Sequence, residues 1–215
     1  VVQTAFARHC AKVVVVVGQE STDIRGYLAA RFPDKTIEYA VQKEQLGTGH
    51  AARLGLQALG RFSGQVLILY GDVPLLKAQT LGRLQRALRG HEVAVLSAHL
   101  DDPTGYGRLL RQGTKLVSIV EQRDCSPAQK EIKEGNVGVY LASAKLLRHV
   151  LGTLNRNNAQ GEYYLTDIVE AGARKGGACA VVVKDLDEIC GVNDRRQLAR
   201  AESIFQHRKI EDLMQ

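Results

Sequence analysis

The chain has 215 residues, of which 45% are hydrophobic and 24% charged, a composition typical of one globular domain with a substantial core. Its net charge of +6 comes from lysines and arginines spread along the sequence, and only 5% of the residues are aromatic, so no nucleic-acid-binding surface is predicted. No apolar run approaches the roughly 20 residues of a membrane helix and no charged-then-apolar leader opens the chain, so no membrane association is predicted either.

In chain order, the hydrophobic pattern predicts alternating strands and helices. Residues 1–12 have the pattern of the end of a helix. The expected strands cover residues 11–18, 36–41, 65–70, 92–100, 115–122, 136–142 and 179–184. The expected helices cover residues 21–32, 49–59, 80–88, a segment capped by Ser143, 165–174 and the segment from Asp194 onward, whose Leu198, Ala201 and Phe205 share one face. This alternation predicts an α/β, Rossmann-like fold with a mostly parallel sheet and helices on both faces.

The segment 42–51, QKEQLGTGHA, is the first candidate site. Two glycines, Gly47 and Gly49, come just before an apolar-periodic helix, and Thr48 is available as its N-cap. Backbone N–H groups at such a helix start can face a nucleotide because no side chain blocks the approach. Glycine at this position is also common in ordinary turns, so the segment alone does not decide between the two.

The segment 65–76, QVLILYGDVPLL, is the second candidate. Its apolar strand ends in Gly71 and Asp72, and ligands of open parallel sheets bind outside the carboxyl ends of the strands. A carboxylate there can hold a hard cation together with phosphate oxygens, as magnesium prefers. The alternative is that Asp72, close before a proline, is a turn residue.

These segments and five others resemble the uridylyltransferase domain of the bifunctional N-acetylglucosamine-1-phosphate uridylyltransferases that also carry a glucosamine-1-phosphate N-acetyltransferase. The matching segments occur in family order and cover nearly the whole chain. They are QKEQLGTGHA at 42–51, YGDVPLL at 70–76, PTGYGRLLR at 103–111, IVEQRD at 119–124, EGNVGVY at 134–140, NAQGEYYLTDIV at 158–169 and GVNDRRQLA at 191–199. The resemblance implies a nucleotide-diphospho-sugar transferase fold.

The resemblance also implies a domain organisation. Residues 1–193 correspond to the nucleotidyltransferase (pyrophosphorylase) domain without its first strand and Gly-rich phosphate loop. Residues 194–215 correspond to the helix that connects to a left-handed β-helix domain, through which the family forms homotrimers. Two strand edges are therefore expected to lack a partner, and residues 1–215 alone are expected to be inactive.

The reaction implied by the resemblance transfers uridylate from UTP to N-acetylglucosamine-1-phosphate, giving UDP-N-acetylglucosamine and pyrophosphate in the cytoplasm. The attacking phosphate is already an anion, so positioning and charge neutralisation are needed rather than a general base. Asp72 and Asn193 match the family's Mg²⁺ ligands, and the ion would bridge the phosphates of both substrates and act as a Lewis acid. Without the resemblance, Asn193 would be assigned as a helix N-cap.

The other site residues are assigned from the same matches. Those of the nucleotide site are Gln42, Gly47, Thr48, Tyr70, Gly71 and Asp72, and those of the sugar site are Gly107, Glu121, Asn136, Tyr164 and Thr166. Without the resemblance, Glu121 is equally a surface charge at a strand end, Tyr164 a core residue and Thr166 a helix cap. Asn136 is disfavoured in a strand, which favours a specific polar role.

One departure affects the sugar site. Gly135 and Val137 stand where the family more often has an aliphatic residue and a threonine, and a lost hydroxyl can weaken a phosphate or sugar contact. Two alternatives therefore remain, a pyrophosphorylase for another sugar-1-phosphate and a non-catalytic nucleotide-sugar-binding module. The four cysteines are scattered without metal-ligand spacing and are expected to be free thiols in a reducing cytosol.

Overall fold

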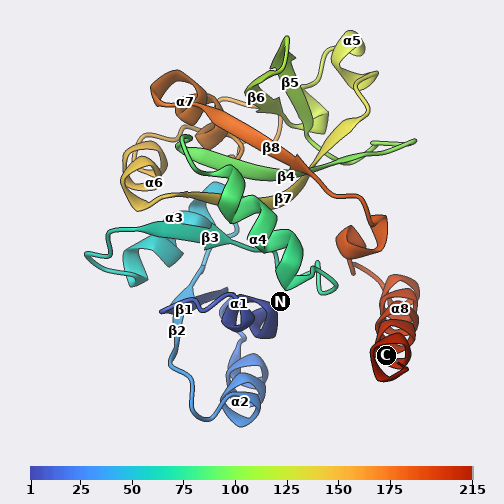
Figure 1. Cartoon of the computed structure of the whole chain (residues 1–215). Coiled ribbons are helices and arrows are strands. Elements are labelled where there is room, and N and C mark those ends of the chain that lie inside the picture. Colours follow the sequence, from blue (N-terminus) through green and yellow to red (C-terminus); the bar gives the residue numbers. More distant parts are fainter. Residues whose placement is uncertain (215) are drawn as a thin grey trace.

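The computed structural model describes residues 1–214, apart from the side chain of Asp212. The helices are α1 Val2–Ala7, α2 Thr22–Arg31, α3 Thr48–Ala58, α4 Ala78–Ala87, α5 Pro127–Lys130, α6 Ala144–Leu151, α7 Asp167–Lys175 and α8 Arg195–Leu213. The strands are β1 Val13–Val17, β2 Ile37–Val41, β3 Gln65–Ile68, β4 Val93–His99, β5 Arg108–Gln112, β6 Lys115–Val120, β7 Glu134–Ser143 and β8 Ala178–Val182. The order of helices and strands therefore follows the sequence pattern closely (Figure 1).

The strands form two sheets, and the larger one is mixed rather than mostly parallel. Its strand order is β6-β5-β7-β4-β8, with β3 also paired to β7. β7 runs antiparallel to β3, β4 and β5, whereas β4 and β8 are parallel. The prediction of a mostly parallel sheet is therefore wrong, because β7 lies between β3 and β4 and runs antiparallel to both.

The sequence pattern also missed one strand. β5 and β6 form an antiparallel hairpin in which Arg108 pairs with Val120 and Gln112 with Lys115. Gly113, at φ +61°, occupies the turn and takes a left-handed conformation that favours glycine. The hairpin positions Gly107 and Glu121 side by side at its open end, because these residues flank the first pair of the ladder.

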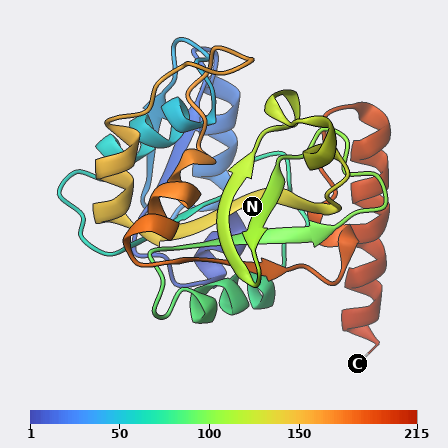
Figure 2. The same ribbon diagram turned by 90° about the horizontal axis from the view of Figure 1, so that it is seen from above.

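Helices cover both faces of the larger sheet, as the sequence predicted. Alternate residues of β4 enter opposite cores: Val93 and Val95 pack with α3, α6 and α7, whereas Ala94 and Leu96 pack with α4. Figure 2 shows α4 on one side of the strands and α6 and α7 on the other. This two-layer burial explains why the first four residues of β4, Val93 to Leu96, are all apolar.

The smaller sheet consists of the parallel pair β1 and β2, which lies with α1 and α2 at one end of the molecule (Figure 1). Among the described residues, β1 pairs with β2 alone and β3 pairs with β7 alone. Each of the two strands thus has one edge without a backbone partner among the described residues. Helix α3 contacts β1, β2 and α6 and so connects the two parts of the fold.

The last helix, α8, only partly follows the sequence expectation. Ala201 is buried, but Leu198 and Phe205 are 55% and 61% exposed, so the three residues do not share a buried face. The face that contacts the body contains Ala201, Ile204 and Arg208, because these positions are separated by about one turn each. No helix among residues 1–214 is both long and apolar enough to cross a membrane.

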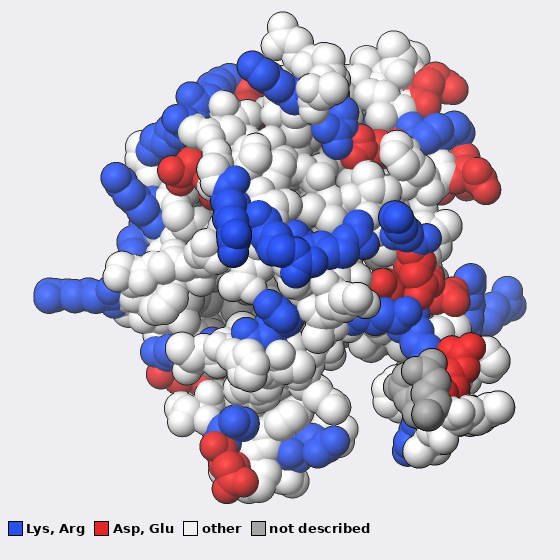
Figure 3. All heavy atoms as spheres, viewed as in Figure 1, with Lys and Arg blue, Asp and Glu red and all other residues white. Residues whose placement is uncertain are grey.

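Positive charge gathers on one face of the molecule. Figure 3 shows a band of Lys and Arg side chains across the middle of the view, where Figure 1 has α4. Residues 73–91, which contain this helix, include no Asp or Glu, and Arg86 and Arg89 are exposed. The band gives the surface a positive potential that extends into solvent and attracts anions from a distance.

Candidate functional site

One pocket, with a volume of about 400 Å³, gathers most of the residues singled out from the sequence. Candidate residues in its wall come from seven separate parts of the chain: Thr48, Tyr70 and Asp72, Gly107, Glu121, Asn136, Tyr164, and Asn193. They are brought together because the ends of β3, β6 and η2 (Leu186–Ile189), the amino end of α3 and the start of β7 meet at this pocket.

The pocket wall begins at the turn into α3. Gly47 has φ +100°, and a Cβ atom at this residue would lie 2.8 Å from the carbonyl oxygen of Tyr163. Gly47 is the N-cap of α3, and no side chain caps this helix, so the prediction that Thr48 is the N-cap is wrong. Instead, the Thr48 hydroxyl accepts a hydrogen bond from the Leu165 backbone N–H at 3.3 Å. The helix start is thereby joined to residues 163–165, which continue the same wall.

A line of hydrogen bonds runs behind the pocket floor. Asn136 Nδ2 donates to the Tyr140 hydroxyl at 2.6 Å, and hydroxyl contacts continue from Tyr140 to Tyr70 and from Tyr70 to Thr48. Burial raises the pKa of Tyr70 to about 12 and that of Tyr140 well above its ordinary value. Both phenols therefore stay protonated at neutral pH and serve as hydrogen-bonding groups, not as bases.

Gly138 makes room for this arrangement. Its φ is +79°, and a Cβ atom there would lie 2.6 Å from a ring carbon of Tyr70. The backbone N–H of Gly138 donates to Asn136 Oδ1 at 3.1 Å. The amide of Asn136 is thus fixed at both its oxygen and its nitrogen, while the residue still faces the pocket.

Glu121 is the most perturbed carboxyl group of the pocket wall. Burial raises its pKa, the hydrogen bond from Thr166 Oγ1 at 3.1 Å lowers it, and the negative charges of Asp124, Asp167 and Glu162 raise it further. The interpretation of Glu121 as a solvated surface charge is therefore inconsistent with its environment. Perturbed carboxyl groups of this kind are typical of functional sites, although structural networks produce them as well.

Tyr164 lies beside this acidic group. It is 8% exposed and lines the pocket, and its hydroxyl donates to Asp124 Oδ2 at 2.9 Å and accepts from Gln160 Nε2 at 3.0 Å. Burial raises the pKa of Tyr164 to about 12. Gln160 and Glu162 also line the pocket and were not predicted as site residues, although both lie inside the NAQGEYYLTD segment that carried the resemblance. Asp124 does not line it and contributes only by accepting the hydrogen bond from Tyr164.

Asp72 and Asn193 lie on adjoining segments at the pocket rim. The backbone N–H of Val192 donates to the backbone oxygen of Asp72 at 2.8 Å. The N-cap of α8 is Asp194, whose side chain accepts from the Gln197 N–H at 2.7 Å, so the alternative that Asn193 is the N-cap is wrong. The Asn193 side chain is therefore left exposed at the pocket rim, next to the segment that carries Asp72.

This pair has the chemistry of a magnesium site that is completed by the substrate. Carboxylate and amide oxygens are hard ligands, and Mg²⁺ is commonly held by one or two protein groups together with phosphates and water. Residues 1–214 contain no group of three or more His, Cys, Asp and Glu side chains that could hold a metal by themselves. Two oxygen ligands at the rim are a partial set for Mg²⁺, which phosphate and water oxygens would complete.

Not every predicted site residue faces this pocket. Gln42, Gly47, Gly71 and Thr166 do not line it. Gln42 Nε2 donates to the Gly47 oxygen at 3.2 Å, so it supports the turn before α3. Thr166 is 2% exposed and acts through Glu121. It occupies the N-cap position of α7 without capping it, so the helix-cap alternative is wrong.

The two departures from the family pattern lie in different environments. Val137 lines the pocket and also packs in the core below α4. At Gly135, a Cβ atom would lie 3.0 Å from Leu100 Cδ1 and 3.3 Å from Tyr106 Cβ, so this position faces those side chains. Only the loss of a hydroxyl at Val137 therefore changes the pocket wall. All four cysteines are free thiols, as expected.

Residues 1–151 match the family of MobA-like NTP transferase domains. The chain is 44% identical over 204 residues to the bifunctional protein GlmU of Anaeromyxobacter sp. (strain Fw109-5), covering 94% of this chain and 42% of that protein. It is 47% identical over 207 residues to GlmU of Trichlorobacter lovleyi, covering 94% and 44%, and 41% identical over 216 residues to GlmU of Acinetobacter baylyi, covering 100% and 46%. The chain thus spans less than half the length of these relatives.

Among solved structures, the chain resembles a putative glucose-1-phosphate thymidylyltransferase from Bacillus anthracis in complex with a sucrose. The TM-score is 0.68 at 19% identity, and the match covers 94% of this chain and 79% of that chain. At this identity the likeness establishes the fold alone, which is the α/β nucleotidyltransferase fold expected from the sequence. Together with the sequence matches, it places the chain in the MobA-like NTP transferase family, among the nucleotidyltransferases of the GlmU type.

Proposed function

We propose that this chain is the catalytic domain for uridylyl transfer from UTP to N-acetylglucosamine-1-phosphate, with UDP-N-acetylglucosamine and pyrophosphate as products. The observation that carries the proposal is the 400 Å³ pocket in which candidate nucleotide, sugar and metal residues from distant parts of the chain come together, namely Thr48, Tyr70, Asp72, Gly107, Glu121, Asn136, Tyr164 and Asn193. Convergence of this kind in a concave, partly polar pocket is the usual mark of a ligand site.

The charges of the pocket wall support a reaction that depends on a divalent cation. Its charged lining residues are Asp72, Glu121 and Glu162, and no Lys or Arg lines it within the described chain. Such a wall repels phosphate groups unless a cation lies between them. We propose that Asp72 and Asn193 hold Mg²⁺, which when bound neutralises phosphate charge and polarises the reacting phosphoryl group.

The chain's own residues then bind and orient the substrates. Thr48 lies at one end of the pocket wall, where its hydroxyl and nearby backbone groups can hydrogen-bond to a uracil base. Gln42 supports this end through its hydrogen bond to the Gly47 oxygen. Glu121 and Asn136 lie on the sugar side, with their orientation fixed by Thr166 and Tyr140. Because the nucleophile is an anionic phosphate, in-line positioning is the main contribution required of these groups.

The same pocket is compatible with two alternatives that a direct experiment separates. One is a pyrophosphorylase for another sugar-1-phosphate, and the other is a nucleotide-sugar-binding module without turnover. The relatives named GlmU and the pocket position of Asn136 favour N-acetylglucosamine, whereas Val137, which lacks the hydroxyl common in the family, favours the first alternative.

Calorimetric titrations with UDP-N-acetylglucosamine, UDP-glucose and dTDP-glucose test the proposal, each with and without Mg²⁺. We expect UDP-N-acetylglucosamine to bind best, with a clear gain from Mg²⁺ that Asp72→Ala removes. Pyrophosphate release from UTP and the matching sugar phosphate, measured with the full-length protein, tests catalysis. Preferential binding of another nucleotide sugar would support the first alternative, and binding without any pyrophosphate release would support the second.

A further inference from the structure

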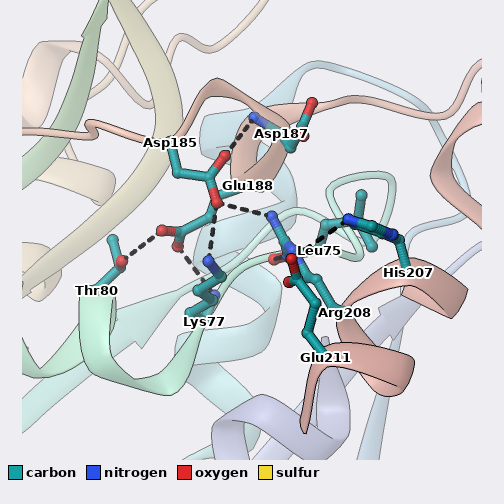
Figure 4. A network of polar contacts seen from close by, with 9 residues as sticks. All are labelled: Leu75, Lys77, Thr80, Asp185, Asp187, Glu188, His207, Arg208 and Glu211. Atoms are coloured by element: carbon teal, nitrogen blue, oxygen red, sulfur yellow. Dashed lines mark hydrogen bonds and ion pairs between the residues drawn. The ribbon is translucent and has the colours of Figure 1, made fainter. Parts of the chain in front are cut away.

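Two segments that are more than a hundred residues apart in the sequence lie side by side next to the proposed metal pair. Residues 72–80 follow β3 and enter α4, and residues 185–193 lead from β8 through η2 to α8. The Val192 N–H donates to the Asp72 oxygen at 2.8 Å, and Figure 4 shows a second set of contacts between the segments, centred on Glu188 and Asp185. The position of Asn193 relative to Asp72 therefore depends on how these two segments are joined.

Glu188 is the buried contact of this junction. It is only 5% exposed, Oε1 accepts a hydrogen bond from Thr80 Oγ1 at 2.9 Å, and Oε2 accepts one from the Lys77 backbone N–H at 3.0 Å. Lys77 is the N-cap residue of α4, which has no side-chain cap of its own. A carboxylate from another segment thus caps the helix, where free N–H groups and the helix dipole favour negative charge.

Asp185, on the same segment, makes a different kind of contact. Its carboxylate receives Lys77 Nζ at 2.8 Å and an Arg208 nitrogen at 3.0 Å, but its side chain is 38% exposed. Exposed ion pairs of this kind contribute little, because water screens the charges and long side chains lose freedom. The junction therefore depends more on the buried Glu188 than on the visible ion pairs around Asp185.

The chain between Glu188 and the metal pair has little freedom to move independently. Ile189, the next residue, is buried in the same core cluster as Val73 and Leu76, which follow Asp72. Lys77 is five residues from Asp72 along the chain, and Glu188 is five residues from Asn193. A displacement of Glu188 from the first turn of α4 would therefore be transmitted to the contact between Val192 and Asp72.

We propose that Glu188 is a positioning residue: by capping the first turn of α4, it holds residues 189–193 so that Asn193 stays beside Asp72. The inference rests on the proposed role of Asp72 and Asn193 as the metal pair. It adds to that proposal a buried carboxylate which touches neither substrate nor metal, and whose partners are Thr80 and Lys77.

Amide hydrogen exchange in residues 1–215 tests the positioning directly and requires no ligand. Glu188→Gln keeps the side-chain shape but replaces one acceptor oxygen by an NH₂ group that faces a donor. We expect the Val192 amide to exchange about tenfold faster or more, relative to the Val95 amide in the buried strand β4, because a buried hydrogen bond to a charged group is lost. Asp185→Asn is the matched control and leaves this ratio unchanged.

Equal acceleration of exchange at Val192 and Val95 in Glu188→Gln would mean that Glu188 only stabilises the whole fold, and would overturn the inference. No acceleration at Val192 would overturn it as well. If Glu188→Gln does not fold, Thr80→Val removes one of the two donors and keeps the carboxylate. It should give the same selective effect at Val192 with a smaller size, and absence of that effect would count against the proposal.

Mn²⁺ binding, followed by electron paramagnetic resonance in the presence of UDP-N-acetylglucosamine, connects the geometry to the site. We expect Glu188→Gln to weaken Mn²⁺ binding several-fold, Asp185→Asn to leave it unchanged, and Asp72→Ala to abolish it. Loss of binding in Asp72→Ala with normal binding in Glu188→Gln would refute the positioning role alone. Normal binding in Asp72→Ala would refute the proposed metal pair, and the inference with it.

Discussion

The ion pair between Arg111 and Glu134 should contribute more to stability than any exposed ion pair of the chain. Arg111 donates from Nε and Nη2 to the two oxygens of Glu134 at 2.7 and 2.8 Å, and Ser97 Oγ donates to the same carboxylate at 2.7 Å. The pair joins β5 to the start of β7. Two residues of the pocket wall lie close to it along the chain: Gly107, which directly precedes β5, and Asn136, two residues after Glu134.

Arg111→Met removes both charged donors and leaves the carboxylate with Ser97. Loss of one partner of a fully buried pair costs about 3–5 kcal/mol of unfolding free energy. The Glu134 side chain is 9% exposed but that of Arg111 is 31% exposed, so water can replace part of the lost contact. We therefore expect a loss of roughly 2–3 kcal/mol, which corresponds to a decrease in Tm of about 5–10 °C for a chain of this length.

Urea unfolding at pH 7 measures this loss. Arg174→Met is the control, because the Arg174–Glu170 pair is exposed and its removal should cost less than about 0.5 kcal/mol.

Burial alone would raise the pKa of Glu134, but hydrogen bonds from Arg111 and Ser97 and the charge of Arg111 hold it below its usual value. The stability gained from the pair is therefore complete above the unfolded pKa and is lost as pH falls through the folded pKa. Equal, small losses in both variants, or a difference that persists unchanged in acid, would refute this reasoning.

Glu121→Gln should stabilise the fold at pH 7 and weaken sugar binding. Because the pKa of Glu121 is raised in the folded state, the free energy of unfolding of the parent protein decreases as pH rises from the unfolded pKa through the folded pKa; paired urea titrations at pH 4 and 7 check this. Asp72→Ala, in a full-length protein that is active, should lower turnover on the order of a thousandfold without unfolding, and near-normal turnover in a pyrophosphate assay would contradict its role. Gly138→Ala should cost about 2 kcal/mol or more in urea unfolding, since its φ is +79° and the new methyl group would meet the Tyr70 ring. Residues 1–215 alone should bind UDP-N-acetylglucosamine weakly and release no pyrophosphate, because no Lys or Arg lines the pocket within the described chain; robust release by this chain would contradict that account.

The sequence by itself determined most of the order of strands and helices, with β5 missed, the position of Asp72 after an apolar strand, and the family. These features depend on local periodicity and on motif segments that are each contiguous in the chain. The sequence did not determine the direction of strand pairing. β3 and β4 run in the same direction, but β7, which comes much later in the chain, lies between them and runs in the opposite direction.

Tertiary structure alone decided which polar residues serve the pocket and which support it. Glu188 lies in an acidic segment that resembles a solvated turn, yet it is buried because α4 presents an uncapped first turn to it from more than a hundred residues away. Thr48 and Asn193 both have sequence contexts typical of N-caps, and neither caps a helix, because Gly47 and Asp194 occupy those positions. Leu198 and Phe205 have the spacing of a buried stripe but lie in solvent, since α8 faces the body through Ala201 and Arg208. Periodicity defines the faces of a helix, but which face is buried depends on long-range contacts that no local pattern contains.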